Sequence, residues 1–351
     1  MSENTKIEWA DSSWSPWRGC TKVSAGCANC YAETLSKRNP AVLGQWGKGK
    51  PRVLAKNWND PVKWNRIAGW GTCPCCKSTR DTSSTGNCKR CGENDRTFSR
   101  PRVFPSLCDW LDPEVPVEWL ARFLKLIHDT PHLDWLLLTK RPENWYRRIY
   151  NTLLHVEGIT DPNLTEDDPQ TPVGSMLNDW LRMEDSNAPR NVWIGTSVED
   201  QANTDRRIPA MLKTPARVRF LSVEPMLGPV DLPLKCSRDH NGDGDCYWHP
   251  NGCPLIDWLI VGGESGPGAR PCNVDWIRSV VRQCANAKVP CFVKQLGARA
   301  RGSGSCRDCA DNGPICPNSG LPCAGLDHPK GGDPEEWPAD VRVRQMPEVK
   351  P

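Results

Sequence analysis

The stretch "LDWLLLTKRP" (133–142) is a short apolar run that ends directly in charged residues. Its core does not alternate between apolar and polar residues, which is typical of a strand buried on both faces of a sheet. Five further runs have the same form: RVFPSLCD (102–109), NVWIGTSVED (191–200), RVRFLSVEP (217–225), DWLIVGGESG (257–266) and VPCFVKQLG (289–297). A possible first strand, "SSWSPWRG" (12–19), precedes them.

Helical patterns follow several of these runs. Examples are NCYAETLSKR (29–38), VPVEWLARFLKLIHDT (115–130) and NVDWIRSVVRQCANA (273–287). Strand followed by helix, repeated along a chain, predicts a parallel sheet with crossover helices. We therefore expect an α/β fold, a partial or complete parallel (β/α) barrel, which 351 residues are enough to build.

Three polar, cysteine-rich segments interrupt this rhythm. We interpret residues 71–98 as a small insertion, 232–256 as a second insertion, and 299–351 as an appended tail. The barrel core is then expected to comprise residues 1–70 and 99–298, with the cysteine loop at its amino-terminal end.

Composition limits the kind of protein. The net charge is +3, which is too near neutral to predict nucleic-acid binding from charge alone. No apolar run is long enough for a membrane span, and the amino terminus lacks the apolar core of a signal peptide, so we expect a cytoplasmic protein without membrane contact. In that compartment nineteen cysteines, partly in C-x2-C pairs, indicate metal binding instead of disulfides.

Polar residues stand at the ends of the apolar runs, where barrel proteins place their sites. The candidates for holding a cofactor are Lys140, Ser197, Glu199, Glu224, Gly262, Gly263 and Glu264. In "GGESGPGAR" (262–270) the glycines would let the backbone approach a ligand closely. The alternative is that such residues only mark the return of the chain to solvent, or a tight turn into the next helix.

Three cysteines gather in "RGCTKVSAGCANCYAE" (18–33), at Cys20, Cys27 and Cys30. A structural zinc site needs a fourth ligand, for which Cys108 or Cys272 are candidates. A catalytic cysteine would be paired with a histidine, yet no histidine ends an apolar run. A [4Fe–4S] cluster can be held by three thiolates with one iron left open for a small molecule.

Other cysteine groups have zinc-like spacing. Cys73, Cys76, Cys88 and Cys91 form two C-x2-C pairs and predict a zinc ribbon. Cys306, Cys309, Cys316 and Cys323 suggest a second site, zinc or Fe–S, and Cys236, Cys246, Cys253 and His249 a possible third zinc site.

Several motifs together resemble a known family. They are TKIEWADSSWSPWRGCTKVSAGCANCYAE, LLLTKRPEN, IGTSVEDQ, RFLSVEPMLGPV, IVGGESGPGARP and FVKQLG. They are similar to a phage and bacterial family of unknown function, known for its three-cysteine motif and described as radical-SAM-like. The radical S-adenosylmethionine (SAM) superfamily usually has C-x3-C-x2-C, whereas here the first gap is six residues.

The resemblance implies a barrel enzyme with a [4Fe–4S] cluster on Cys20, Cys27 and Cys30. It would cleave SAM and abstract hydrogen from an unknown substrate, with a nucleotide or nucleic acid as one candidate. A flavodoxin- or ferredoxin-type electron donor is implied, and a further protein partner is open. The alternative is a zinc-stapled protein that binds nucleic acid or a partner without redox catalysis.

Overall fold

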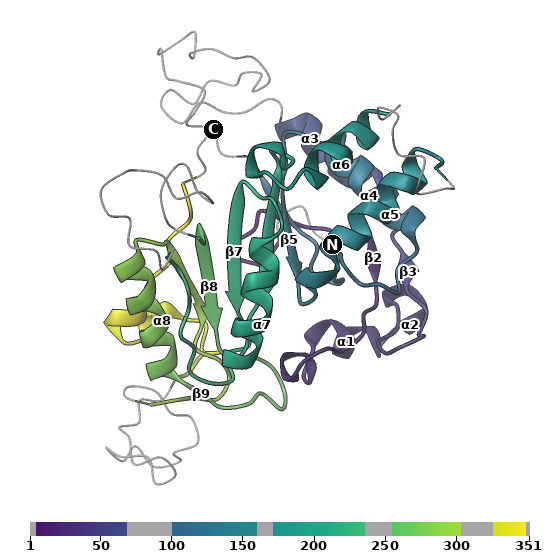
Figure 1. Cartoon of the computed structure of the whole chain (residues 1–351). Helices are drawn as coiled ribbons and strands as arrows, with labels where there is room; N and C mark the ends of the chain where they lie inside the picture. Colours follow the sequence, from purple (N-terminus) through teal and green to yellow (C-terminus); the bar gives the residue numbers. More distant parts are fainter. Residues whose placement is uncertain (1–4, 69–99, 160–170, 236–254, 303–325, 349–351) are drawn as a thin grey trace, which may run out of the picture.

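The computed structural model describes residues 5–68, 100–159, 171–235, 255–302 and 326–348. Its centre is a seven-stranded sheet in the order β1-β4-β5-β6-β7-β8-β10, and every neighbouring pair is parallel. The sheet curls into a half-barrel (Figure 1). This confirms the expected α/β class and the parallel sheet.

The seven strands fall within the runs that the sequence indicated. Their bounds are β1 Ser12–Ser13, β4 Arg102–Phe104, β5 Asp134–Thr139, β6 Val192–Ser197, β7 Val218–Val223, β8 Trp258–Gly262 and β10 Cys291–Gln295. Two small sheets pair β2 (Trp17–Arg18) with β3 (Val53–Leu54) and β9 (Cys272–Asn273) with β11 (Ala300–Arg301).

The described helices follow the strands in chain order. They are α1 Tyr31–Ser36, α2 Pro40–Leu43, α3 Asn59–Ala68, α4 Val117–His128, α5 Trp145–Val156, α6 Pro172–Leu181, α7 Gln201–Leu212 and α8 Val274–Ala287. None of the described helices has the length and apolar character that crossing a bilayer requires.

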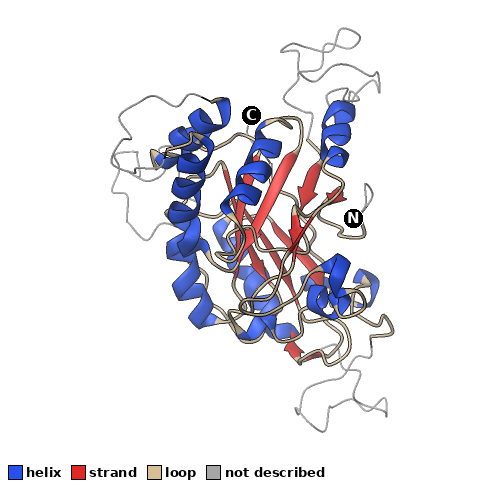
Figure 2. Ribbon diagram, turned by 90° about the vertical axis from the view of Figure 1, so that its right-hand side faces the viewer, coloured by secondary structure: helices blue, strands red, loops and turns tan. Residues whose placement is uncertain are grey.

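One face of the sheet packs against the helices. In β5, Trp135 and Leu137 join this helix-facing core, while Leu136 between them points to the other side. Helix α4 presents Leu120, Phe123, Leu124 and Ile127, at intervals of three and four residues, to the same core. Figure 2 shows the strands as one curved layer with the long helices outside it.

The inner face of the half-barrel is filled by aromatic side chains near the amino-terminal ends of the strands. Trp9 lies 4.5 Å from Phe104 and 6.1 Å from Trp258 between ring centroids. The same aromatic cluster includes Trp193, Phe220 and Phe292. Beyond this aromatic layer, polar side chains stand at the carboxyl ends of the strands on the inner face.

The end of the cysteine-rich tail packs on the half-barrel. Trp337 and Val341 are buried in the helix-facing core. The backbone of Val343 and Gln345 exchanges hydrogen bonds with Val293 and Cys291, which covers the free edge of β10. A covered edge cannot pair with another chain. The tail from 326 onward is thus part of the barrel body.

The expected zinc sites fall outside the described residues. This applies to Cys73, Cys76, Cys88, Cys91, Cys236, Cys246, Cys253, His249, Cys306, Cys309, Cys316 and Cys323. The zinc assignments at these positions stay predictions.

Asp134, the first residue of β5, lowers the stability of the folded state by an amount that depends on pH. Burial raises the pKa of its carboxyl to about 6, although Arg100, whose Nη1 lies 3.6 Å from Oδ1, and Arg102 oppose the shift. The folded state thus binds the proton more tightly than the unfolded chain, so the free energy of unfolding falls as the pH rises from 3.8 to about 6, and the full cost applies above that range.

Replacing this carboxylate by a neutral amide is expected to stabilise the fold. Asp134→Asn should raise the free energy of unfolding by up to about 3 kcal/mol near pH 8, and the gain should shrink as the pH falls below about 6. Urea unfolding of both proteins at several pH values measures the difference. A gain that does not change with pH would contradict the assignment.

Candidate functional site

The candidate residues gather at one end of the half-barrel because strand side chains alternate between the two faces. Leu136 of β5 and Trp193 of β6 belong to the inner face. Every second residue shares that face, so the inner row of β5 leads to Lys140, and the inner row of β6 leads to Ser197 at its end and to Glu199 beyond it. The inner rows of β7 and β8 lead in the same way to Glu224 and to Gly262 and Glu264. The sequence thus identified residues that the fold brings together at the carboxyl end of the half-barrel, which we call its mouth.

The cysteine loop crosses this mouth between β2 and α1. Cys20 follows β2, the 3₁₀ turn Ala25–Cys27 forms the middle of the loop, and Cys30 precedes the first residue of α1. The Cys20 carbonyl accepts a hydrogen bond of 2.9 Å from the Gly47 amide. The loop reaches the sheet through polar contacts to residues at three strand ends.

Glu199, after β6, holds the middle of the loop. Its side chain is fully buried, and Oε1 accepts a 2.8 Å hydrogen bond from the Ser24 hydroxyl and lies 3.1 Å from the Lys140 amine. Oε2 accepts a 2.7 Å bond from Arg207 of α7. A Cβ at Gly26 would lie 2.2 Å from Oε1, so only glycine lets the loop approach this closely.

The charges around Glu199 keep it ionised. Burial alone would raise the pKa of this carboxyl, but Lys140 and Arg207 outweigh it and hold the pKa below its usual value. With both oxygens occupied by chain partners, Glu199 serves as an anchor for the cysteine loop.

Glu264, after β8, holds the far side of the loop. It receives three hydrogen bonds from the Arg270 backbone and guanidinium, of 2.7 to 2.9 Å. The Asn29 amide donates to Glu264 Oε2 at 3.0 Å and to the Gly268 carbonyl at 2.9 Å. Arg270 also donates to the Ala25 carbonyl at 2.8 Å. The glycine-rich segment thus contacts the cysteine loop at Ala25 and at Asn29, on both sides of Cys27.

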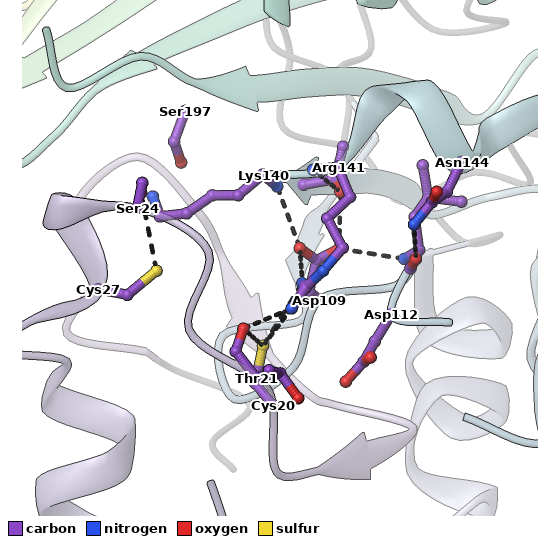
Figure 3. A network of polar contacts seen from close by, with 12 residues as sticks. Cys20, Thr21, Ser24, Cys27, Asp109, Asp112, Lys140, Arg141, Asn144 and Ser197 are labelled. Atoms are coloured by element: carbon purple, nitrogen blue, oxygen red, sulfur yellow. Dashed lines mark hydrogen bonds and ion pairs between the residues drawn. The ribbon is translucent and has the colours of Figure 1, made fainter. Parts of the chain in front are cut away.

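Arg141, after β5, holds the Cys20 end (Figure 3). Its guanidinium donates to Asp109 Oδ2 at 2.6 Å and lies 3.6 Å from Cys20 Sγ, and it also donates to the Thr21 carbonyl. Thr139 donates to the other oxygen of Asp109 at 2.6 Å. Burial alone would lower the pKa of Arg141, but the charges around it, led by the Asp109 carboxylate, outweigh burial and hold the pKa above its ordinary value.

Their surroundings raise the pKa of two of the three thiols. Burial, followed by the charge of Asp109, raises the pKa of Cys20 to about 12, and Arg141 opposes the shift. Burial also raises the pKa of Cys30. A metal that binds these thiols as thiolates must displace their protons.

Glu224 and Lys294 form a more open ion pair on the inner face. Lys294 Nζ lies 3.0 Å from Glu224 Oε1, and the side chains are 34 % and 13 % exposed. A Cβ at Gly262 would lie 2.9 Å from the same carboxylate oxygen, so this glycine leaves room for Glu224. Ser197 and Ser222 are buried in the neighbouring strands β6 and β7.

The two candidates for a fourth ligand lie in different places. Cys108 directly precedes Asp109, and burial, followed by the charge of Asp109, raises the pKa of its thiol. Cys272 is buried in the helix-facing core, where burial raises its pKa to about 12. Cys284 and Cys291 are also buried in that core, as expected for apolar packing.

Sequence reasoning did not assign three of the anchoring residues. Ser24 and Asn29 sit inside the cysteine motif, where their contacts across 175 and 235 residues leave no local pattern. Arg207 is fully buried on α7 and also donates to the Ser197 carbonyl at 2.8 Å. A charged residue on the apolar side of a helix is the one signal that could have indicated it.

Removing one of these contacts tests how firmly the loop is held. Asn29→Ala removes the donor to the Glu264 carboxylate and to the Gly268 carbonyl. It should therefore lower the free energy of unfolding by about 1–2 kcal/mol and speed the exchange of the backbone amides of residues 24–30. Asn151→Ala, at an exposed position on α5, is the control. Equal exchange in the two variants would show that Asn29 does not fasten the loop.

These features define an α/β half-barrel protein with a three-cysteine loop anchored across the carboxyl ends of its strands. The chain belongs to the family described as "Protein of unknown function (DUF5131)", whose model matches residues 4–316. No curated protein and no solved structure matches the chain.

Proposed function

We propose that the chain is a radical-SAM-like enzyme that holds a [4Fe–4S] cluster on Cys20, Cys27 and Cys30. The observation that carries this proposal is the placement of the loop. Three thiols lie on one segment that is anchored to residues following β5, β6 and β8, at the carboxyl end of the half-barrel. Parallel barrels place their chemistry at that end.

The donor set suits a cluster. Within the described ranges no three His, Cys, Asp or Glu side chains converge closely enough to hold one metal ion. A single zinc ion draws its thiolates to about 2.3 Å from one centre, whereas a cluster distributes them over separate iron atoms. Three cysteines on one short loop supply the thiolates of such a cluster with one iron left open, as the sequence suggested.

When bound, the reduced cluster would supply the electron that cleaves a C–S bond of SAM and starts hydrogen abstraction. The chain's own residues have separate tasks. Glu199, Glu264 and Arg141 fix the cysteine loop, and Lys140 compensates the charge of Glu199. Glu224 and Lys294 offer opposite charges to the amino and carboxylate groups of an amino-acid moiety, beside the hydroxyls of Ser197 and Ser222.

Anaerobic purification with iron and sulfide tests the proposal. We expect a brown protein with an iron–sulfur electron paramagnetic resonance signal after reduction, and 5′-deoxyadenosine formed from SAM when dithionite is present. A colourless protein that contains zinc alone, with no SAM cleavage, would contradict it and favour the zinc-stapled binding protein. Addition of nucleotides or nucleic acid then tests the substrate class that the sequence suggested.

A further inference from the structure

Two sulfurs of the cysteine loop have polar neighbours of different charge. Arg141, which follows β5, approaches Cys20, with its Nη1 at 3.6 Å and its Nη2 at 3.8 Å from Sγ. The Ser24 hydroxyl lies 3.8 Å from Cys27 Sγ. A cationic donor therefore faces the sulfur of Cys20, whereas a neutral hydroxyl faces that of Cys27.

The guanidinium of Arg141 is fixed by oxygen acceptors as well as by Cys20. It is buried, and its Nη1 donates to Asp109 Oδ2 at 2.6 Å while its Nη2 donates to the Thr21 carbonyl (Figure 3). Asp109 is held in turn, because the Thr139 hydroxyl donates to its other oxygen at 2.6 Å. A planar, fork-shaped donor held in this way is preorganised, so it keeps its N–H groups directed at the sulfur.

We propose that Arg141 is a positioning residue that hydrogen-bonds the Cys20 sulfur of the bound cluster and raises the reduction potential of that cluster. This inference rests on the proposed function, because it needs a cluster on Cys20. Hydrogen bonds to the ligating sulfurs are one of the means by which a protein sets such a potential. Uptake of one electron adds negative charge, so a cationic donor beside one sulfur stabilises the reduced form more than the oxidised form.

Asp109 has the opposite effect on the same sulfur. Its carboxylate contacts Nη1 of Arg141, the nitrogen that also faces Cys20, so its negative charge lies close to the sulfur. The side chains of Arg141 and Asp109 are only 6 % and 8 % exposed, which limits the screening of both charges by water. Loss of the arginine and loss of the carboxylate should therefore move the potential in opposite directions.

A potentiometric titration with dithionite measures the effect on the anaerobically loaded full chain. The electron paramagnetic resonance signal reports the fraction of reduced cluster at each potential. Arg141→Gln removes the charge and the fork, so it should lower the ratio of reduced to oxidised cluster about 10-fold at a fixed potential, which corresponds to about 59 mV for one electron. Arg141→Lys keeps a cation without the fork and should recover part of this loss. Asp109→Asn should raise the ratio.

Two control variants separate tuning of the potential from loosening of the loop. Asn29→Ala loosens the cysteine loop at its contact with Glu264 and leaves Arg141 in place. Arg147→Gln makes the same chemical change as Arg141→Gln at an exposed position on α5. Both controls should keep the potential of the unaltered chain, because neither removes a donor from a cysteine sulfur.

The outcomes distinguish this inference from the proposed function. Equal potentials in the unaltered chain and in Arg141→Gln, or shifts of the same sign in Arg141→Gln and Asp109→Asn, would overturn the role of Arg141 and leave the cluster assignment standing. If Arg141→Gln takes up no iron, the opposite shifts expected of Arg141→Lys and Asp109→Asn decide the question. Absence of an iron–sulfur signal in the unaltered chain would refute the proposed function and this inference together.

Discussion

Cys27→Ala is expected to abolish SAM cleavage and to lower the iron content of the anaerobically loaded protein. Cys27 ends the 3₁₀ turn that Arg270 and Ser24 hold in place. Loss of a residue that only orients a metal ligand typically costs 10–100-fold in metal affinity, so loss of a ligand itself should cost about 100-fold or more. Iron analysis, the paramagnetic resonance signal and 5′-deoxyadenosine formation measure the effect.

The matched control is Cys284→Ala. Cys284 is buried on α8 in the helix-facing core, so this variant removes a thiol without touching the loop. It should keep its iron and its activity and lose only a little stability. Iron content and SAM cleavage that are unchanged in Cys27→Ala would contradict the cluster assignment. Loss of iron with a melting temperature like that of the control would support it.

Glu199→Ala is expected to cause a large loss of stability. The substitution leaves Arg207 fully buried and Lys140 largely buried without their carboxylate. Removing one partner of a buried ion pair costs about 3–5 kcal/mol, because the remaining charge stays in a poorly solvated place. The Ser24 hydroxyl also loses its acceptor, so the cysteine loop should exchange amide protons faster.

Urea unfolding measures the stability of the Glu199 variants. Glu199→Gln keeps the size of the side chain but not its charge, so it should recover only part of the loss. Glu118→Ala, at an exposed position in the first turn of α4, is the control and should stay within about 0.5 kcal/mol of the unaltered protein. A loss of less than about 1 kcal/mol in Glu199→Ala would show that the anchor is not needed.

The seven strands could be predicted because a strand buried on both faces has a local signature. "DWLLLT" and "VWIGTS" each contain an unbroken apolar run, WLLL and VWI, and polar residues follow it closely. The same pattern placed Lys140, Glu199 and Glu264 at one end of the sheet, since parallel strands share their direction. The three cysteines were visible for the same reason, because their spacing is local.

The roles of the strand-end residues could not be predicted, because they depend on contacts between distant segments. From the sequence, Glu199 and Glu264 were candidate cofactor ligands. In the structure their carboxylates are occupied by Ser24, Lys140 and Arg207, and by Asn29 and Arg270. Asp109 and Arg141 end their runs in the same way, yet only the fold brings them to Cys20.

The sequence by itself determined the strands, their parallel direction and the three-thiol loop, because each follows from local apolar runs or short spacing. Only the tertiary structure decided that the loop lies across the strand ends, which carboxylates hold it, and that the tail from 326 covers the edge of β10. These depend on hydrogen bonds and ion pairs between residues far apart in the chain. Such contacts require the buried geometry of the folded sheet, and they leave no trace in local composition.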